Sequence, residues 1–521
     1  MRRLLGQPLF LFLLLCVLAF LFFSTGLDDW GQRQAEHIAL LRDDFGTARK
    51  DSLLKKLGLP RVTHPQTGHL VEGARNDLSS LPVMSLRAVA IRVAEADLSD
   101  PEKGLQTNSR QRGREWERPA GVAVLRNGQE LLAAPAGIRL QGNRATRDML
   151  HSFRLYFRAS YGENTVPGSA FLDDAHMNVR KIVLRKEKNP VPGFVTMLAF
   201  DVARRVGSMT PDYAPVHMFL NGRSLGLGLA SEHVNRTHWE RRLGHRNFAF
   251  YVLEAENSVL DSAQYKALRF RLDPFFGLWE YDRVAEILDV NDFMRAMTCF
   301  AFVQWQDWNQ GALILDRTEA GPRWKSVLWD ADLAFAGLRS DGVPENRAGW
   351  KNLRDAHGLR AAVFKGMWEN SQQFREEFLR LLSWTINHRL TRAWIEERIR
   401  HYTGLETDSG LDCFDAGVAL TYLLQRRVDL LAETTRDLGA PDVIACRVES
   451  PQPVVVDDER VTTSYEGLYF RGQAITLAPQ PHASFSHWIV DERHVHEPRL
   501  TLELQRDTVV RAAFFPSANP S

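Results

Sequence analysis

The sequence predicts an α+β fold: a domain of mixed strands and helices behind an N-terminal transmembrane helix, followed by a small all-β module. Three observations support this prediction. The chain opens on a long apolar segment without charge. Its middle starts with short β-type runs and continues with amphipathic helical runs, an order typical of α+β domains. Its last part has only short alternating runs separated by Gly, Pro and Asp.

The leader has the features of a signal anchor. No charged residue occurs from Leu4 to Leu27, and at about 1.5 Å per residue a helix of that length reaches roughly 36 Å, more than the ~30 Å core of a bilayer. Two arginines precede the span and two aspartates follow it, which favours a cytoplasmic N-terminus. A cleaved signal peptide is the alternative. Residues 1–27 are therefore predicted to anchor the chain in the cell membrane as a single pass, with an extracytoplasmic body, periplasmic or at the cell surface.

Four further parts of the chain are predicted after the anchor. A juxtamembrane helix and a linker cover residues 28–80, a domain covers 81–438, and the β module covers 451–521. Within the domain, Asn127-Gly128 lies between two β-type runs, which predicts a tight hairpin. The expected strands are 84–93, 120–126, 136–140, 153–158, 214–220, 312–315 and 324–328, and the expected helices are 194–206, 283–302, 373–388, 391–402 and about 418–438.

Composition and charge exclude some classes of function. The chain has 65 Lys and Arg against 64 Asp and Glu, a formal net charge of +1, so no single-sign field attracts a polyanion. Nucleic acid is therefore not an expected partner. Cys299, Cys413 and Cys446 show no C-x-x-C spacing, which gives no indication of a zinc site.

The sharpest candidate site lies around two strands in the middle of the chain. Asp307 comes before the apolar strand at 312–315, while Asp330 and Asp332 follow the strand at 324–328. A hairpin of these strands would bring the three carboxylates to the same end. Converging carboxylates suit the binding of hard divalent cations. Two of the three aspartates could hold the cation, and the third could orient a nucleophile. Read alone, these aspartates also fit ordinary turn positions, because D-x-D occurs by chance.

Several segments occur in the chain in the order of a known family pattern: Ile138–Asn143, Ser152–Phe157, Val216–Gly226 with Glu232, Asp307–Asp316 and Trp329–Asp332. Together they resemble the CotH (spore coat protein H) kinase family, and the resemblance extends over most of residues 81–438. It implies an atypical protein-kinase-like fold. It also implies transfer of the γ-phosphoryl group of ATP, bound with Mg²⁺ or Mn²⁺, to a hydroxyl of a protein or of a cell-envelope polymer.

The resemblance also implies roles for single residues. Asp307 matches the catalytic aspartate, which would orient the acceptor hydroxyl. Asp330 matches the metal-binding aspartate, and Asp332 is a second candidate ligand. Glu232 would orient a phosphate-binding cation or hold a second metal. Gln310, a candidate cofactor-binding residue, falls where the family has an asparagine after its catalytic aspartate, unless Asn309 takes that place by a one-residue shift.

The chain departs from the family pattern at one set of basic residues. Members of the family usually carry lysines just before the strand that corresponds to Ser152–Phe157, whereas this chain has Leu150 and His151 there. A cation must still face the nucleotide phosphates, because phosphoryl transfer depends on charge stabilisation. Arg154 and Lys181 are the expected substitutes, with Arg158 and Arg185 as further candidates, since arginine can bind phosphate through two nitrogens.

Two alternatives to an active kinase remain, of which the missing lysines favour the first. The first is a catalytically inactive pseudokinase that acts as a cell-surface binding or assembly module. The second is a nucleotide-sugar transferase, because D-x-D also occurs as a metal motif in such enzymes; the chain shows no regular βαβ alternation to support it.

Three segments of the C-terminal module carry a second resemblance: Ala474–Pro479, Phe485–Trp488 and Asp507–Phe514. They resemble the internalin-type B-repeat, a bacterial repeat domain. The resemblance implies a small β module for surface adhesion or spacing. Phe485, Trp488 and Phe514 are expected to form its core, because a unit of this size buries little surface without large aromatic side chains.

Overall fold

The computed structural model describes residues 84–515 apart from 143–151, 174–176, 187–193, 254–279, 306–310, 336–349, 351–358, 412–413, 463 and 482–483. All described residues belong to one compact unit of the chain. The predicted anchor, juxtamembrane helix and linker, together with Asp307 and Gln310, lie outside them. No helix of the described part is long and apolar enough to cross a bilayer. The predicted mixture of strands and helices is confirmed.

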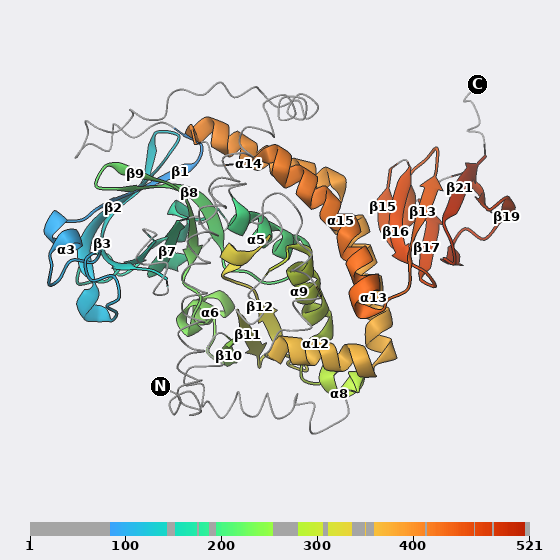
Figure 1. The fold of residues 1–521 in the computed structure, drawn as a ribbon, viewed down its shortest axis with the longest axis horizontal. Coiled ribbons are helices and arrows are strands. Elements are labelled where there is room, and N and C mark those ends of the chain that lie inside the picture. Colours follow the sequence, from blue (N-terminus) through green and yellow to red (C-terminus); the bar gives the residue numbers. More distant parts are fainter. Residues whose placement is uncertain are drawn as a thin grey trace, which may run out of the picture. The chain divides into compact units, whose positions relative to one another are not determined.

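Seven strands form a closed barrel (Figure 1). Most neighbours pair antiparallel, whereas β1 and β8 pair in parallel and close the barrel. Asn127 and Gly128 have φ of 52° and 75° and connect β2 to β3, so the predicted hairpin is confirmed. In order around the barrel, the strands are β1 (Arg87–Arg92), β2 (Arg118–Arg126), β3 (Gln129–Leu140), β4 (Phe153–Tyr156), β7 (Lys181–Lys186), β9 (Arg223–Glu232) and β8 (Tyr213–Leu220).

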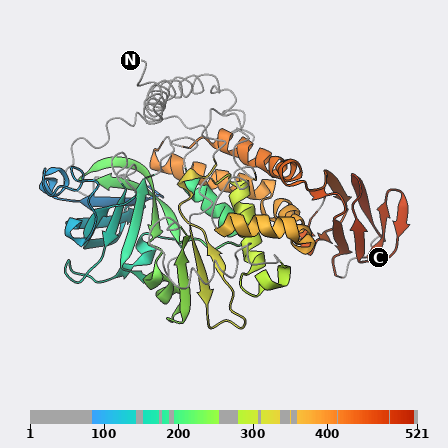
Figure 2. The same cartoon turned by 60° about the horizontal axis from the view of Figure 1, so that its bottom comes forward.

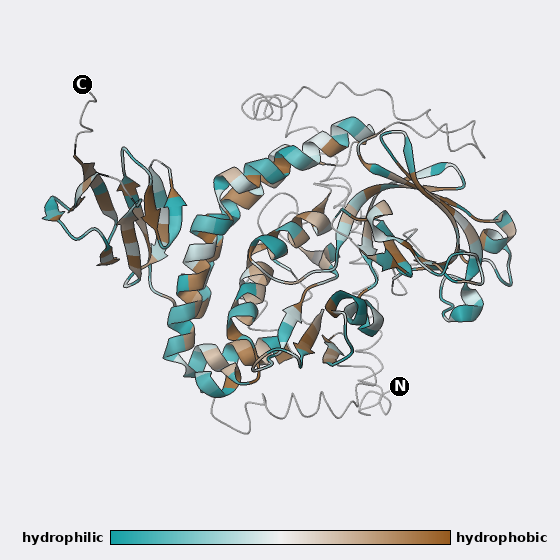
Figure 3. Ribbon diagram, turned by 180° about the vertical axis from the view of Figure 1, so that it is seen from behind, coloured by the Kyte–Doolittle hydropathy of each residue, from teal (hydrophilic) through white to brown (hydrophobic). Residues whose placement is uncertain are grey.

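Apolar side chains of alternate strand residues fill the barrel. Phe153 and Leu155 of β4 and Ile182 and Leu184 of β7 are buried in this core. Because neighbouring residues of a strand point to opposite faces, Arg154 and Tyr156, and likewise Lys181 and Arg185, belong to the outer face. Hydrophobic residues recur along the strands in Figure 3. Short elements accompany the barrel: α3 (Glu95–Ser99), η2 (Arg114–Trp116), β5 (Val166–Pro167), η3 (Gly168–Ala170) and β6 (Asn178–Val179).

A second, three-stranded sheet and most of the helices follow the barrel strands in sequence, whereas α5 lies between β7 and β8. The sheet has the order β10-β11-β12, and β12 packs against α9 (Figure 2). The short turn η6 packs against α5. These elements are α5 (Val195–Arg205), α6 (Arg236–Leu243), β10 (Phe248–Val252), α8 (Tyr281–Ala285), α9 (Val290–Phe302), β11 (Ala312–Asp316), β12 (Lys325–Val327), η6 (Ala331–Leu333), α12 (Leu359–Asn370), α13 (Gln372–Trp384), the π-helical turn η7 (Thr385–Arg389), α14 (Arg392–Ser409) and α15 (Ala416–Leu438).

The single helix predicted over 283–302 is wrong, because the structure has two helices there. The first helix ends at Ala285, and Leu288 then forms a β-bridge with Trp324. Asp289 then caps α9: its side chain accepts a hydrogen bond from the Asp292 backbone at 3.0 Å. The break is therefore produced by a contact with a strand distant in sequence and by an N-cap.

The C-terminal part consists of two sheets with their own core. Trp488 is fully buried, and Phe485 lies 4.9 Å from Trp488 and 5.8 Å from Phe514 between ring centroids. The sheets also include a strand, β13, that precedes the predicted start at residue 451 and pairs with β16 and β21. The first sheet is β16 (Tyr465–Phe470), β13 (Val443–Glu449), β21 (Thr508–Phe514), β18 (Phe485–Val490) and β19 (Arg493–Val495), and the second is β15 (Glu459–Val461), β14 (Val454–Val456), β17 (Ala474–Pro479) and β20 (Leu500–Glu503).

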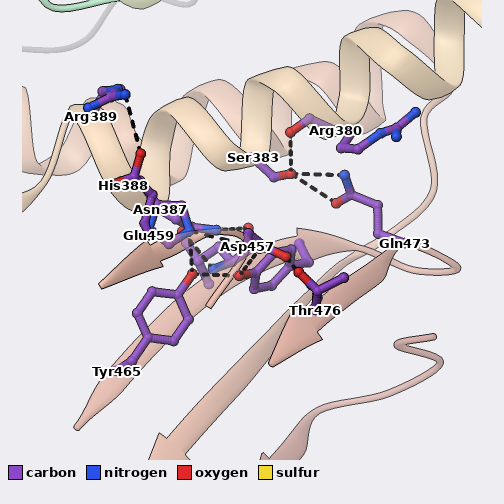
Figure 4. Close-up of polar contacts among 12 residues, drawn as sticks. Arg380, Ser383, Asn387, His388, Arg389, Asp457, Glu459, Tyr465, Gln473 and Thr476 are labelled. Carbon is purple, nitrogen blue, oxygen red and sulfur yellow. Dashed lines mark hydrogen bonds and ion pairs between the residues drawn. The ribbon is translucent and has the colours of Figure 1, made fainter. Parts of the chain in front are cut away.

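Polar side chains connect these sheets to α13 and η7 (Figure 4). The Asn387 amide donates to the Leu468 carbonyl and accepts from the Leu468 backbone N–H, both at 2.9 Å. Ser383 and Gln473 exchange hydrogen bonds at 2.9 and 3.0 Å. The π-helical turn thus presents Asn387 to a strand edge of the module.

Asn387→Ala is expected to destabilise the protein by about 1–3 kcal/mol. The substitution removes both partners of the Leu468 backbone in a buried position, and unsatisfied buried polar groups cost about that much. Urea unfolding of the full chain measures the change. Gln425→Ala, which removes an exposed hydrogen bond on α15, is the matched control and should change the free energy of unfolding by less than about 0.5 kcal/mol. An equal effect of both substitutions would contradict a stabilising contact at Asn387.

Candidate active site

The hairpin predicted to carry the candidate site is present. β11 and β12 pair antiparallel, with Ala312 opposite Val327. The segment that enters β11 and the segment that leaves β12 therefore lie at the same end of the sheet. Gly311, the residue directly before β11, has φ of 112°, and a Cβ there would lie 2.5 Å from the Val327 carbonyl oxygen. Glycine is required at this position. Since Asp307 lies outside the described residues, its approach to Asp330 stays a prediction.

The backbone around the two segments adopts an unusual conformation. Gln304, Asp330 and Phe335 have φ of 48°, 62° and 54°, in the left-handed region that non-glycine residues rarely adopt. The Phe335 backbone N–H donates to the Val303 carbonyl at 2.5 Å, so the two segments are tied together. The Tyr422 hydroxyl donates to the Gln304 side chain. Such conformations persist where the surroundings hold them in place, and they concentrate at functional sites.

A buried ion pair on α15 holds the end of α9 that leads to this site. The Arg426 guanidinium donates to the carbonyls of Phe302 and Ala301 at 3.1 and 3.0 Å. Glu433 accepts from the same guanidinium at 2.6 and 3.1 Å. Both side chains are almost completely buried. Sequence reasoning missed this pair, because no local pattern indicates that an arginine on α15 meets carbonyls more than a hundred residues away.

The two predicted metal ligands meet a cation of the barrel wall. Arg185, on the outer face of β7, pairs through Nη1 with Asp330, and the same nitrogen lies 3.9 Å from Asp332. The Asp332 side chain is buried, whereas those of Asp330 and Arg185 are about one-fifth exposed. Two carboxylates therefore gather around one positive charge. The cation that the structure brings to them is Arg185, which was only a further candidate for the phosphate site.

This donor set fits a hard divalent cation. Mg²⁺ takes oxygen ligands and commonly binds through one or two carboxylates together with phosphate oxygens and water. Asp330 and Asp332 would supply the carboxylates. Among the described residues, no group of three or more His, Cys, Asp or Glu side chains is placed to hold a metal ion. Further ligands would therefore have to come from a nucleotide, from water or from the predicted Asp307.

The predicted phosphate ligands Arg154 and Lys181 lie on the same barrel face as Arg185, but near Tyr156 rather than near Asp330. In the β4–β7 register Lys181 is opposite Tyr156, and Arg154 is opposite Val183. The Lys181 ammonium lies 5.8 Å from the centre of the Tyr156 ring. The structure thus separates Arg185, which contacts the carboxylates, from the two residues that were expected to bind phosphate. Their contact with a nucleotide stays a prediction.

Glu232 ends β9 in a buried position with two partners. Its Oε1 lies 3.3 Å from Nδ1 of His238 on α6, and its Oε2 accepts from the Asp212 backbone at 3.2 Å. Burial acts to raise the pKa of Glu232, but the hydrogen bond and charge of His238 hold it below its usual value. These contacts join the barrel to α6. The predicted role of Glu232 toward a cation or second metal is not tested by them.

Comparison with known proteins identifies the family of this site. The family model described as CotH kinase protein matches residues 138–271 and 279–407, about half of the chain. The matched residues include Arg185, Asp330 and Asp332 and extend from the barrel to α14. No match was found among curated proteins.

Proposed function

This chain belongs to the CotH kinase protein family, and on that premise we propose that it is an atypical kinase. The family implies use of a nucleotide and a divalent metal in general. The proposed reaction transfers the γ-phosphoryl group of ATP, bound with Mg²⁺ or Mn²⁺, to a hydroxyl of a protein or of a cell-envelope polymer. The observation that supports it is the grouping of Asp330 and Asp332 around Arg185.

Each residue of this group has a role in the proposed reaction. A divalent cation, when bound, supplies neutralisation of the phosphate charge. Asp330 and Asp332 would hold it through carboxylate oxygens. Arg185 is placed to exchange its carboxylate partners for phosphate oxygens, which its guanidinium can bind in pairs.

Asp307, the predicted catalytic residue, orients the acceptor hydroxyl and accepts its proton. The new bond forms between the hydroxyl oxygen and the γ-phosphorus while the bond from that phosphorus to ADP breaks. Most of the rate in such transfers comes from positioning and charge stabilisation rather than from the proton acceptor.

A second candidate function is a pseudokinase that binds partners at the cell surface without phosphoryl transfer. The ion pair between Arg185 and Asp330 supports it, because the pair already neutralises the charges that a metal–nucleotide complex would use.

Nucleotide binding and labelling by the purified full chain test the proposal. An active kinase is expected to bind ATP more tightly with Mg²⁺ or Mn²⁺ than with EDTA, and to transfer labelled γ-phosphate to itself or to a generic acceptor. Metal-dependent binding without labelling would support the pseudokinase. If the folded chain bound no ATP under any condition, the kinase would be excluded.

We further propose that the body of the protein lies outside the cytoplasm, tethered by residues 1–27. The uncharged span and the two arginines before it support this topology. A reporter joined after Ser521 should then be active outside the cytoplasm; activity confined to the cytoplasm would contradict the topology.

A further inference from the structure

Cations gather around one aromatic ring on the outer face of the barrel. The guanidinium carbons of Arg139 and Arg158 lie 4.2 and 5.0 Å from the centre of the Tyr156 ring, and the Lys181 ammonium lies 5.8 Å from it. Arg154, two residues before Tyr156 on β4, shares this face. We call Arg139, Arg154, Arg158 and Lys181 the basic cluster.

One buried carboxylate balances only part of this charge. Glu117 accepts hydrogen bonds from Arg139 at 2.9 and 3.1 Å and from Arg158 at 2.7 and 3.1 Å, so both of its oxygens are used. Among the described residues, no carboxylate forms an ion pair with Arg154 or Lys181. Within this part of the chain, four positive charges therefore face one negative charge.

The two members without a described carboxylate partner, Arg154 and Lys181, show the consequences of this imbalance. Burial lowers the pKa of Lys181, and the charges of Arg154, Arg158 and Arg139 lower it further. Burial likewise lowers the pKa of Arg154. The Arg154 Nε is buried without a hydrogen-bond partner among the described residues. A buried donor left unsatisfied is costly, and like charges at close range repel.

A purely structural explanation accounts for half of the cluster. Arginines over a tyrosine ring stabilise a fold through cation–π contact, and the Glu117 ion pairs hold Arg139 and Arg158 there. That explanation leaves the unsatisfied Nε of Arg154 and the uncompensated Lys181 without a reason. An oxyanion would satisfy both, because charge-assisted hydrogen bonds from arginine and lysine are strongest to phosphate and carboxylate groups.

We propose that the basic cluster is a binding site for a phosphate-class oxyanion, distinct from the pair of Arg185 and Asp330. Lys181 and Arg185 point to the same face of β7, four residues apart, which is about 13 Å along a strand. A phosphate at the cluster and a phosphate at Arg185 can therefore belong to one extended ligand or to two. The two sources are the nucleotide itself and a phosphorylated stretch of the acceptor. The site does not depend on phosphoryl transfer and applies to an active kinase and to a pseudokinase alike.

Binding of inorganic phosphate in EDTA to the full chain, measured by titration calorimetry, tests the site without metal or catalysis. Arg154→Gln and Lys181→Gln are expected to weaken phosphate binding about tenfold each, which corresponds to ~1.4 kcal/mol. Neither residue pairs with a described carboxylate, so the melting temperature in phosphate-free buffer should stay the same or rise. Arg223→Gln, at an exposed position of β9 outside the cluster, is the control and should bind phosphate as the parent does.

Two results of the phosphate titration would overturn the proposal. One is a folded parent protein that binds no phosphate. The other is unchanged phosphate affinity in both variants, which would leave the cluster with a structural role. A lowered melting temperature in either variant without loss of phosphate binding would also indicate that structural role.

The source of the oxyanion follows from two further probes, metal-free ATP and a phosphoserine peptide. If Arg154→Gln weakens ATP binding alone, the cluster binds the nucleotide phosphates. If it weakens peptide binding alone, the cluster binds the acceptor. If Arg154→Gln weakens the binding of neither ATP nor the peptide, the result contradicts the site even if inorganic phosphate binds. Because these measurements use no metal, their failure is distinguishable from failure of the kinase proposal.

Discussion

Asp330→Ala is expected to abolish the metal dependence of ATP binding, lowering affinity in Mg²⁺ on the order of 100-fold. The substitution removes a metal ligand and leaves the triphosphate charge unneutralised beside Asp332. It also releases Arg185 from its carboxylate partner. Metal-free ATP binding should therefore stay the same or become tighter. The ATP affinities measured with Mg²⁺ and with EDTA should then become similar. Calorimetric titrations with Mg²⁺ and with EDTA measure both affinities.

Two comparisons make this result specific. Asp282→Ala, at an exposed position on α8, should leave both affinities unchanged. Asp307→Ala should leave binding largely intact but lower phosphate transfer by about 10²–10⁴-fold, the usual contribution of a general base. A parallel loss of binding in Asp307→Ala would show that this residue holds the nucleotide instead. Unaltered metal dependence in Asp330→Ala would remove Asp330 from the metal site.

Glu433→Ala is expected to lower the free energy of unfolding by about 3–5 kcal/mol, because it leaves the charge of Arg426 buried and unpaired. Arg426 also holds the carbonyls of Ala301 and Phe302, from which the chain continues toward Asp307. The variant should therefore lose ATP-dependent labelling even at temperatures where it remains folded. Urea unfolding and labelling of the folded protein measure the two effects.

Asp429→Ala is the matched control, since it removes a carboxylate from the same helix that takes part in an exposed hydrogen bond with Gln425. It should change the free energy of unfolding by less than about 0.5 kcal/mol. A loss below about 1 kcal/mol in Glu433→Ala would mean that water or another group compensates Arg426. The pair would then not be the anchor of α9.

Several features could be predicted because their signals are local. The hairpin at Asn127-Gly128 follows from residues that accept positive φ, and both have it in the structure. The pairing of β11 with β12 follows from two apolar runs joined by a turn. Trp488 at the centre of the C-terminal core follows from the need for large aromatic side chains in a small module. The CotH family was recognisable because its motifs occur in order, and the family match confirms it.

Other features depended on partners distant in sequence. Strands β7 and β9 were not predicted, since a short apolar run between charges also fits a helical turn. The parallel pairing of β1 with β8, which closes the barrel, joins segments more than a hundred residues apart. The break before α9 depends on the bridge between Leu288 and Trp324.

The sequence by itself determined which residues supply the chemistry: aspartates at 307, 330 and 332, and basic residues at 154, 158, 181 and 185. Only the tertiary structure decided which cation meets which carboxylate. Arg185 reaches Asp330 because the outer face of β7 lies against the segment that leaves β12, while Lys181, on the same face, lies beside Tyr156. Charge pairing acts over a few ångströms, so it is settled by which faces pack together, and packing is a property of the whole fold.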